Sequence, residues 1–257
     1  MRPSVPPQTF QEHNDMPIET ALTTGDRSKF TWRRTLLAVA ALLVAAICLA
    51  PFDVVISQTL QTKFLPGDLR KIIHLSEIFA HGFGVAMILI GMWVLFPEKR
   101  KYIPRVAMLA AFSGLTVQCI KLFIVRQRPV DFSSKWEEAT SSWHGLIDNF
   151  ALNLDNNFQS FPSGHTATAV GLAIGLTYVY PRGKYLFTVL AILAALQRIV
   201  STAHWTSDVL SGAAVALIVS CLLMQNYGLG RFCNRIESKN DSNSNKATKT
   251  PSSSSKM

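Results

Sequence analysis

Six apolar segments, separated by charged or polar residues, constrain the fold of this chain most strongly. They span residues 35–52, 78–96, 103–125, 166–180, 185–200 and 209–224. A transmembrane helix needs roughly 20 mainly apolar residues, within a range of about 17–25. The first three segments reach this length and are apolar on all sides, as expected for helices in lipid. The last three reach it only with the polar residues at their ends, so buried helices of a soluble bundle are the alternative.

The composition of the chain favours the membrane interpretation. Charged residues make up 16% and hydrophobic residues 49% of the 257 residues, whereas soluble domains contain about 25% charged residues. The net charge of +9 would suit a nucleic-acid-binding protein. However, the basic residues interrupt the apolar segments and form no stripe with interleaved aromatic residues. We therefore predict an all-α integral membrane protein, a bundle of six transmembrane helices, with no nucleic-acid partner.

Lysine and arginine residues are unevenly distributed between the two sides of the predicted bundle, which sets its orientation. The richer side carries Arg27, Lys29, Arg33, Arg34, Lys99, Arg100, Lys101, Arg105, Arg182, Lys184, Arg231, Arg235 and Lys239. The poorer side carries Lys63, Arg70, Lys71, Arg126, Arg128 and Lys135. Six crossings place both termini on the richer side, so we predict that both are cytoplasmic.

The two ends of the chain differ in composition from its apolar middle. From Glu237 onward the residues are almost all Ser, Asn, Lys, Asp and Thr, which cannot bury enough apolar surface to order themselves. We predict a flexible polar arm at residues 1–30, a six-span domain at 31–230 and a disordered cytoplasmic tail at 231–257. The outer connection at 131–160 is long, as lids and substrate-contacting loops often are.

A first motif cluster, Lys121 with Arg128 and Pro129, lies at the end of the third apolar segment. The two basic residues are seven positions apart, or two helical turns, so we expect them on one helix face, with Pro129 ending the helix. Basic residues near the ends of spans often only extend their charge to the membrane surface. Lys121 is flanked by Ile120 and Leu122, where a charge is costly and usually functional.

A second cluster, Pro162-Ser163-Gly164-His165, immediately precedes the fourth segment. Ser163 is a typical N-cap, and Gly164 allows a ligand to approach the backbone closely. The first N–H groups of a helix are unpaired and lie at the positive end of its dipole, so an anion binds well there. An ordinary capped helix start would explain Ser163, but it leaves His165 unexplained.

A third cluster consists of Arg198, His204 and Asp208. If a helix begins near His204, Asp208 lies one turn away and can accept a hydrogen bond from one imidazole nitrogen, which leaves the other as a lone pair for a substrate. The planar guanidinium of Arg198 can hold two phosphate oxygens. Each residue alone has a structural explanation, for example Asp208 at the helix dipole. Three such clusters on one side of the membrane favour a phosphate site.

Together the patterns Lys-x6-Arg-Pro, Pro-Ser-Gly-His and Arg-x5-His-x3-Asp resemble the motifs of the membrane phosphatidic acid phosphatase type 2 superfamily. The resemblance covers roughly residues 35–226. One position departs from the pattern, because Gln197 stands where the family commonly has Ser before the arginine. The resemblance implies a helical core like that of the acid phosphatases and the vanadium-dependent haloperoxidases.

The resemblance also implies how such a site works, by hydrolysis of a phosphate or diphosphate ester through a phosphohistidine, without a metal or other cofactor. His204 would attack phosphorus while Asp208 holds its tautomer, and His165 would protonate the leaving oxygen and then help to activate water. Phosphoryl transfer needs mainly positioning and charge stabilisation. The groups that supply these would be Lys121, Arg128, Ser163, Gly164 and Arg198.

A site at the outer edge of a bilayer favours a phosphate carried by a lipid. Phosphatidic acid, phosphatidylglycerophosphate, undecaprenyl diphosphate and a lipid A phosphate all fit, and no residue selects among them. We therefore predict an enzyme of the bacterial inner membrane, with its site on the outer, periplasmic face. There are three alternatives. A vanadate-dependent haloperoxidase-like enzyme is disfavoured by the six spans, and a transporter would carry charges at mid-bilayer. A non-catalytic scaffold would not need the three clusters.

A smaller group, His74, Glu77 and His81, lies at the start of the second segment. Glu77 and His81 are one helical turn apart, and His74 and His81 share a helix face. A metal site is one interpretation, although it offers only two histidines and one carboxylate. We favour packing at the interface or contact with a lipid head-group.

Overall fold

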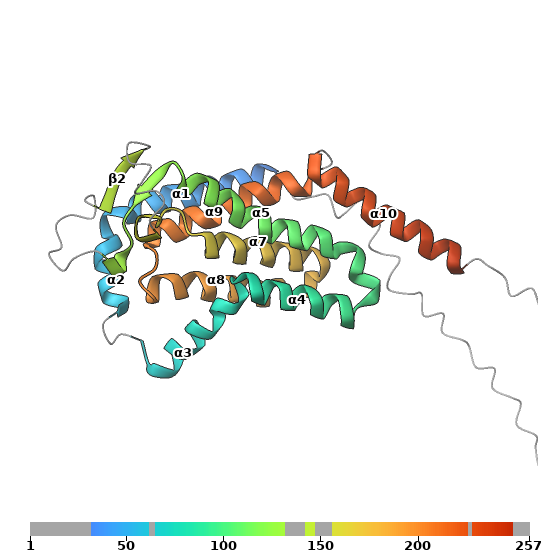
Figure 1. The fold of residues 1–257 in the computed structure, drawn as a ribbon, viewed down its shortest axis with the longest axis horizontal. Coiled ribbons are helices and arrows are strands. Elements are labelled where there is room, and N and C mark those ends of the chain that lie inside the picture. Colours follow the sequence, from blue (N-terminus) through green and yellow to red (C-terminus); the bar gives the residue numbers. More distant parts are fainter. Residues whose placement is uncertain (1–31, 62–64, 132–141, 147–155, 226–227, 249–257) are drawn as a thin grey trace, which may run out of the picture.

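The computed structural model describes residues 32–61, 65–131, 142–146, 156–225 and 228–248 of the chain, and these residues are mainly helical (Figure 1). The α-helices are α1 (Trp32–Leu49), α2 (Asp53–Gln61), α3 (Gly67–Leu75), α4 (Gly82–Leu95), α5 (Ile103–Lys121), α7 (Gly164–Val179), α8 (Lys184–Val200), α9 (Thr206–Met224) and α10 (Gly228–Thr248). Short 3-10 turns connect many of them: η2 (Ala50–Phe52), η3 (Ser76–Phe79), η4 (Pro97–Tyr102), η5 (Pro129–Asp131), η7 (Asn156–Phe158) and η8 (Pro181–Gly183).

Helices α1, α4, α5, α7, α8 and α9 coincide with the six predicted apolar segments. In the described part of the chain, four helical stretches are long and apolar enough to cross a membrane: Arg33–Leu60, Pro97–Lys121, Pro181–Val200 and Thr206–Met224. The stretches Gly67–Phe79 and Gly82–Leu95 meet at an angle of 69° and make a fifth if they are one bent span. Because α7 has only 16 residues, the count of six spans stays a prediction.

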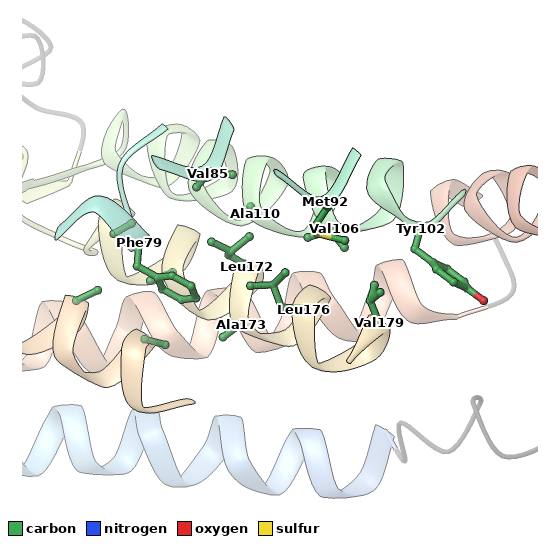
Figure 2. Packing of buried hydrophobic residues seen from close by; sticks show 14 residues of the cluster. Phe79, Val85, Met92, Tyr102, Val106, Ala110, Leu172, Ala173, Leu176 and Val179 are labelled. Carbon is green, nitrogen blue, oxygen red and sulfur yellow. The ribbon is translucent and has the colours of Figure 1, made fainter. Parts of the chain in front are cut away.

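Helix α7 lies between α5 and α8 in the bundle (Figure 1). Figure 2 shows Val106 of α5 facing Leu172 and Leu176 of α7 in the main apolar cluster. The two backbones approach closely at Gly171, where an added Cβ would lie 2.3 Å from the carbonyl oxygen of Leu109. Such close packing through small residues is typical of helices that associate within a membrane.

Large apolar side chains cover the outside of the bundle. Leu37 and Ile47 of α1, Leu95 of α4 and Tyr185 of α8 are each at least 70% exposed. A surface this apolar is unfavourable in water but matches the surroundings of a membrane helix. The outward faces of these helices are therefore the surfaces that contact lipid.

Helix α10 lies in the region where we predicted a disordered tail from residue 231. Residues 231–248 are helical instead. The Nε of Arg105 donates to Glu237 Oε1 at 2.6 Å, and the hydroxyl of Tyr178 donates to Glu237 Oε2 at 3.0 Å. Arg105 is 2% exposed and also donates to the side chain of Asn234 and to the Leu223 carbonyl. Composition could not reveal this buried ion pair. Residues 1–30 and 249–257 lie outside the described residues.

The outer connection at 131–160 contributes a strand to a two-stranded antiparallel sheet, an exception to the all-α prediction. Strand β1 (Ile124–Arg126) pairs with β2 (Trp143–Leu146), with Val125 opposite Gly145. The predicted lid within this connection lies largely outside the described residues. The sheet fixes the chain directly after α5, next to the motif clusters.

Candidate active site

The three motif clusters meet at one end of the bundle, where α5 ends and α7 and α9 begin. Lys121 is the last residue of α5, His165 lies in the first turn of α7, and His204 is two residues before α9. Electrostatic interactions connect the clusters: Lys121 with Arg128, Arg198 and Asp208, and His165 with Arg198, His204 and Lys121. The folded chain thus brings together residues that are up to 87 positions apart in the sequence (208 − 121).

Lys121 and Arg128 do not share a helix face, contrary to the prediction. Helix α5 ends at Lys121, and the β-branched residues Ile124 and Val125 form strand β1 instead of another helical turn. The backbone N–H of Arg128 donates to the carbonyl of Asn157 at 2.9 Å. An extended segment, not a helix, therefore delivers Arg128 to the site, while Lys121 stays 5% exposed at the helix end.

Ser163 caps α7, as the sequence predicts. Its Oγ accepts from the backbone N–H of Thr166 at 3.4 Å and from the Thr166 hydroxyl at 3.0 Å. Its own N–H donates to the carbonyl of Asp208 at 3.0 Å, and the residue is fully buried. Because Oγ accepts both of these bonds, the hydroxyl hydrogen is the group that the Ser163 side chain can offer to a phosphate. The N–H groups of Gly164 and His165 are the ones that this helix start offers to an anion.

Helix α9 contacts the Ser163 segment at Gly212. A Cβ at this glycine would lie 2.4 Å from the carbonyl oxygen of Ser163 and 3.3 Å from its nitrogen. Any larger residue would push apart the backbone that carries His165 and the helix that carries Asp208. By contrast, a Cβ at Gly164 would make only an ordinary contact of 3.6 Å with Val117.

The imidazole of His204 is oriented by a backbone carbonyl. Its Nδ1 lies 2.7 Å from the carbonyl oxygen of Ser160 and 3.7 Å from Oδ2 of Asp208. A carbonyl oxygen can only accept a hydrogen bond, so Nδ1 carries the proton and Nε2 keeps its lone pair. We predicted that Asp208 would hold this tautomer directly. In the structure Asp208 is connected to the imidazole through Ser160. The carbonyl of Ser160 contacts Nδ1, and its hydroxyl donates to Asp208 Oδ2 at 2.5 Å.

His204 is 2% exposed. Burial disfavours the imidazolium and lowers the pKa of His204 to about 4, although the nearby Asp208 carboxylate opposes this shift. The side chain is therefore neutral at physiological pH. A neutral imidazole with a free Nε2 is the form that can act as a nucleophile.

Asp208 belongs to a buried cluster of three charged side chains. Arg126 uses Nη1 to pair with Asp208 and Nη2 to pair with Asp53 Oδ2 at 2.8 Å, and all three side chains are 0% exposed. Ser207 joins the cluster: its N–H donates to Asp53 Oδ1 at 3.0 Å and its hydroxyl donates to the other oxygen. Asp208 also accepts from the N–H of Trp205 at 2.9 Å. The Asp208 carboxylate is thus fixed by strand β1, helix α2 and its own helix start.

Arg198 has one edge of its guanidinium occupied. Its Nη1 donates to Glu77 Oε1 at 2.9 Å and to Gln197 Oε1 at 3.1 Å. Glu77 Oε1 also lies 4.0 Å from Nε2 of His165, and the rings of His165 and His81 are 6.2 Å apart. Glu77 and His81 therefore belong to the surroundings of the site. Within the described residues, no three His, Cys, Asp or Glu side chains are grouped so that they could hold a metal ion.

Sequence reasoning missed Asp53, Arg126 and the carbonyl of Ser160. One signal for Asp53 was available, because a carboxylate inside the apolar stretch Arg33–Leu60 is costly unless it has a partner. Arg126 lies outside the Lys-x6-Arg-Pro pattern that marks Arg128, so its sequence indicates only an outer charge. A backbone carbonyl has no sequence signature at all.

Comparison with known proteins shows the family of this chain. Residues 101–230, just over half of the chain, match the PAP2 superfamily. A lipid A 1-phosphatase of Rhizobium johnstonii is 31% identical over 111 residues, covering 43% of this chain and 42% of that protein. A lipid A 1-phosphatase of Porphyromonas gingivalis is 42% identical over 65 residues, covering 24% of this chain and 15% of that protein. The chain thus matches less than half the length of these curated relatives.

A solved structure shows the same fold. A transmembrane PAP2 type phosphatidylglycerolphosphate phosphatase from Bacillus subtilis superposes with a TM-score of 0.51 at 19% identity, covering 73% of this chain and 92% of that chain. LpxE of Aquifex aeolicus gives a TM-score of 0.47 at 20% identity, covering 66% and 92%. With the family match and four or five stretches able to cross a membrane, the chain is an integral membrane protein that belongs to the PAP2 superfamily.

Proposed function

We propose that this protein is a phosphatase that removes a phosphate from a lipid by way of a phosphohistidine at His204. The observation that carries the proposal is the 2.7 Å contact of His204 Nδ1 with the Ser160 carbonyl. It leaves Nε2 unprotonated beside the cationic side chains of Lys121, Arg128 and Arg198. A buried neutral nucleophile next to three cations suits attack on a phosphate dianion.

In the first step, Nε2 of His204 attacks phosphorus as the ester P–O bond breaks. Burial, together with the nearby cationic Arg198, lowers the pKa of His165 to about 3 in the free protein. The bound phosphate dianion favours the imidazolium again, and protonated His165 then gives its proton to the leaving oxygen. In the second step, water attacks phosphorus and gives a proton to His165, and the P–N bond breaks. The three cations stabilise the phosphate oxygens in both steps, because phosphoryl transfer depends mainly on positioning and charge.

The buried charge cluster supports the phosphohistidine intermediate. Asp208 shares the guanidinium of Arg126 with Asp53, and all three side chains are fully buried. When His204 attacks, its ring becomes cationic while Nδ1 keeps its proton. The carboxylate of Asp208, with Oδ2 3.7 Å from Nδ1, then stabilises that cation in a medium of low dielectric constant.

The substrate that we propose first is a lipid A phosphate, since the curated relatives are lipid A 1-phosphatases. The excess of basic residues on the side of α10 supports a site on the opposite, periplasmic face of a bacterial inner membrane. The cationic clamp and the histidines supply the charge that the reaction needs, so we propose that it proceeds without a metal cofactor. Activity that disappears on chelation and returns with a divalent cation would contradict this last part.

The test is phosphate release by the purified protein from lipid A, phosphatidylglycerophosphate, phosphatidic acid and undecaprenyl diphosphate, with His204→Ala as the control. We expect release by the native protein, fastest from lipid A, and none by the variant. Rapid quenching after addition of labelled substrate should trap a phosphoenzyme that is stable in alkali and labile in acid, as a P–N bond requires. Turnover by His204→Ala at the native rate would refute the mechanism.

A further inference from the structure

Arg198, Glu77 and Gln197 form a closed ring of hydrogen bonds beside the site. Nη1 of Arg198 donates to Glu77 Oε1 at 2.9 Å and to Gln197 Oε1 at 3.1 Å. The amide nitrogen of Gln197 donates to the second oxygen of Glu77 at 3.0 Å. Each side chain therefore fixes the other two, and the guanidinium cannot rotate without breaking at least two of these bonds.

The opposite edge of the same guanidinium has an unused donor. Nε of Arg198 is buried and has no hydrogen-bond partner among the described residues. Nε and Nη2 together form the planar fork that binds two oxygens of a phosphate. A buried donor without a partner is unfavourable in a protein, and a bound phosphate would satisfy this one.

Glu77 is held in place by the turn that carries it. In η3, the Ser76 hydroxyl donates to the carbonyl of Ile73 at 2.6 Å, and Phe79 is buried in the main apolar cluster. Helix α4 begins directly against this turn, since a Cβ at Gly84 would lie 1.8 Å from the carbonyl oxygen of Ile78. The carboxylate of Glu77 therefore comes from an anchored segment, although its side chain is 41% exposed.

We infer that Glu77 and Gln197 are positioning residues that hold Nη1 of Arg198 so that its Nε–Nη2 edge faces the substrate phosphate. The inference rests on the proposed phosphatase function and adds two residues to it. It also gives a role to Gln197, the position that departs from the family pattern. A serine at this position is too short to reach both Glu77 and Nη1 as Gln197 does.

The opposite role for Glu77 makes a distinguishable prediction. A carboxylate paired with Arg198 could compete with the phosphate for it, in which case removing Glu77 would strengthen anion binding. Positioning predicts the reverse, because a guanidinium freed from Glu77 loses its alignment. Orthovanadate imitates the phosphoryl group in the transition state. It is a suitable probe because its binding requires the aligned Nε–Nη2 edge of Arg198 but no leaving group.

The experiment measures kcat, KM and the inhibition constant of orthovanadate for Glu77→Ala, Glu77→Gln and Gln197→Ala in detergent micelles. Asp68→Ala is the matched control, since Asp68 is an exposed carboxylate on the neighbouring α3 that pairs with Lys71. We expect Glu77→Ala to raise the vanadate constant by roughly tenfold or more, as loss of a charge-assisted hydrogen bond implies, and to lower kcat more than it raises KM. Glu77→Gln should recover most of the loss, and Asp68→Ala should equal the native protein.

Each outcome decides between the two roles. A lower vanadate constant in Glu77→Ala overturns the inference in favour of competition, and an unchanged constant overturns it outright. If Glu77→Ala does not fold, Gln197→Ala decides in its place, with a rise of at least about threefold supporting positioning. A native protein that releases no phosphate from any lipid refutes the proposed function itself, which is a separate result.

Discussion

Replacing Arg126 with methionine should destabilise the protein strongly while preserving most of the side-chain volume. The guanidinium pairs with both Asp53 and Asp208, and all three side chains are 0% exposed. Removing one partner from a buried ion pair costs about 3–5 kcal/mol, because it leaves a charge without compensation. For a chain of this size each kcal/mol lowers Tm by about 2–4 °C, so Arg126→Met should lower Tm by about 6–20 °C.

The assay is thermal unfolding in detergent micelles, with Arg182→Met as the control because Arg182 is exposed at the far end of the bundle. Adding Asp53→Asn to Arg126→Met should recover part of the loss, since it removes one of the two unpaired carboxylates. A decrease below about 3 °C, the effect of roughly 1 kcal/mol, would refute the view that Arg126 holds this cluster together. Equal Tm values for the single and double variants would refute the coupling to Asp53.

Three further predictions concern activity. Gly212→Ala should reduce turnover to a small fraction of native, because its Cβ would lie 2.4 Å from the Ser163 carbonyl, whereas Gly91→Ala, with nothing within 4 Å, should be neutral; equal activities would contradict the close approach. The pKa of His204 is lowered to about 4, so its neutral form persists well below the ordinary pKa of 6.5. When kcat/KM is corrected for ionisation of the substrate and plotted against pH, it should therefore fall on the acid side only near pH 4. A fall that begins near pH 6.5 would contradict this. His165→Ala should spare p-nitrophenyl phosphate more than an alkyl phosphate, because a good leaving group needs little protonation; equal losses would argue against His165 as the general acid.

The positions of His165 and His204 could be predicted from the sequence because each lies just before an apolar segment, and both are found at helix starts. Lys121 lies inside its apolar segment, so its place as the last residue of α5 could not be predicted. The local path of the chain after Lys121 could not be predicted in the same way. Residues 124–126 form a strand because they pair with residues 143–146, and that pairing is a tertiary contact that a local pattern does not encode.

The charged residues at the site could be identified from the sequence, but their partners could not. Arg126 and Asp53 are 73 positions apart, so the sequence can mark each as an unusual charge but cannot join them. Glu77 was assigned to the interface, and its contact with Arg198 arises only because the bend between α3 and α4 turns it towards α8. Residue types could therefore be predicted well, whereas partners depended on the packing of distant helices.

The ion pair between Arg105 and Glu237 gives the C-terminal region a share in the stability of the bundle. Arg105 is 2% exposed in the intact chain, and a cut at residue 231, the boundary that composition suggested, would remove the carboxylate that pairs with it. The hydroxyl of Tyr178 on α7 would lose the same acceptor. Affinity tags and fusion partners therefore belong after residue 248, because shortening the chain before Glu237 would weaken the end of the bundle farthest from the site.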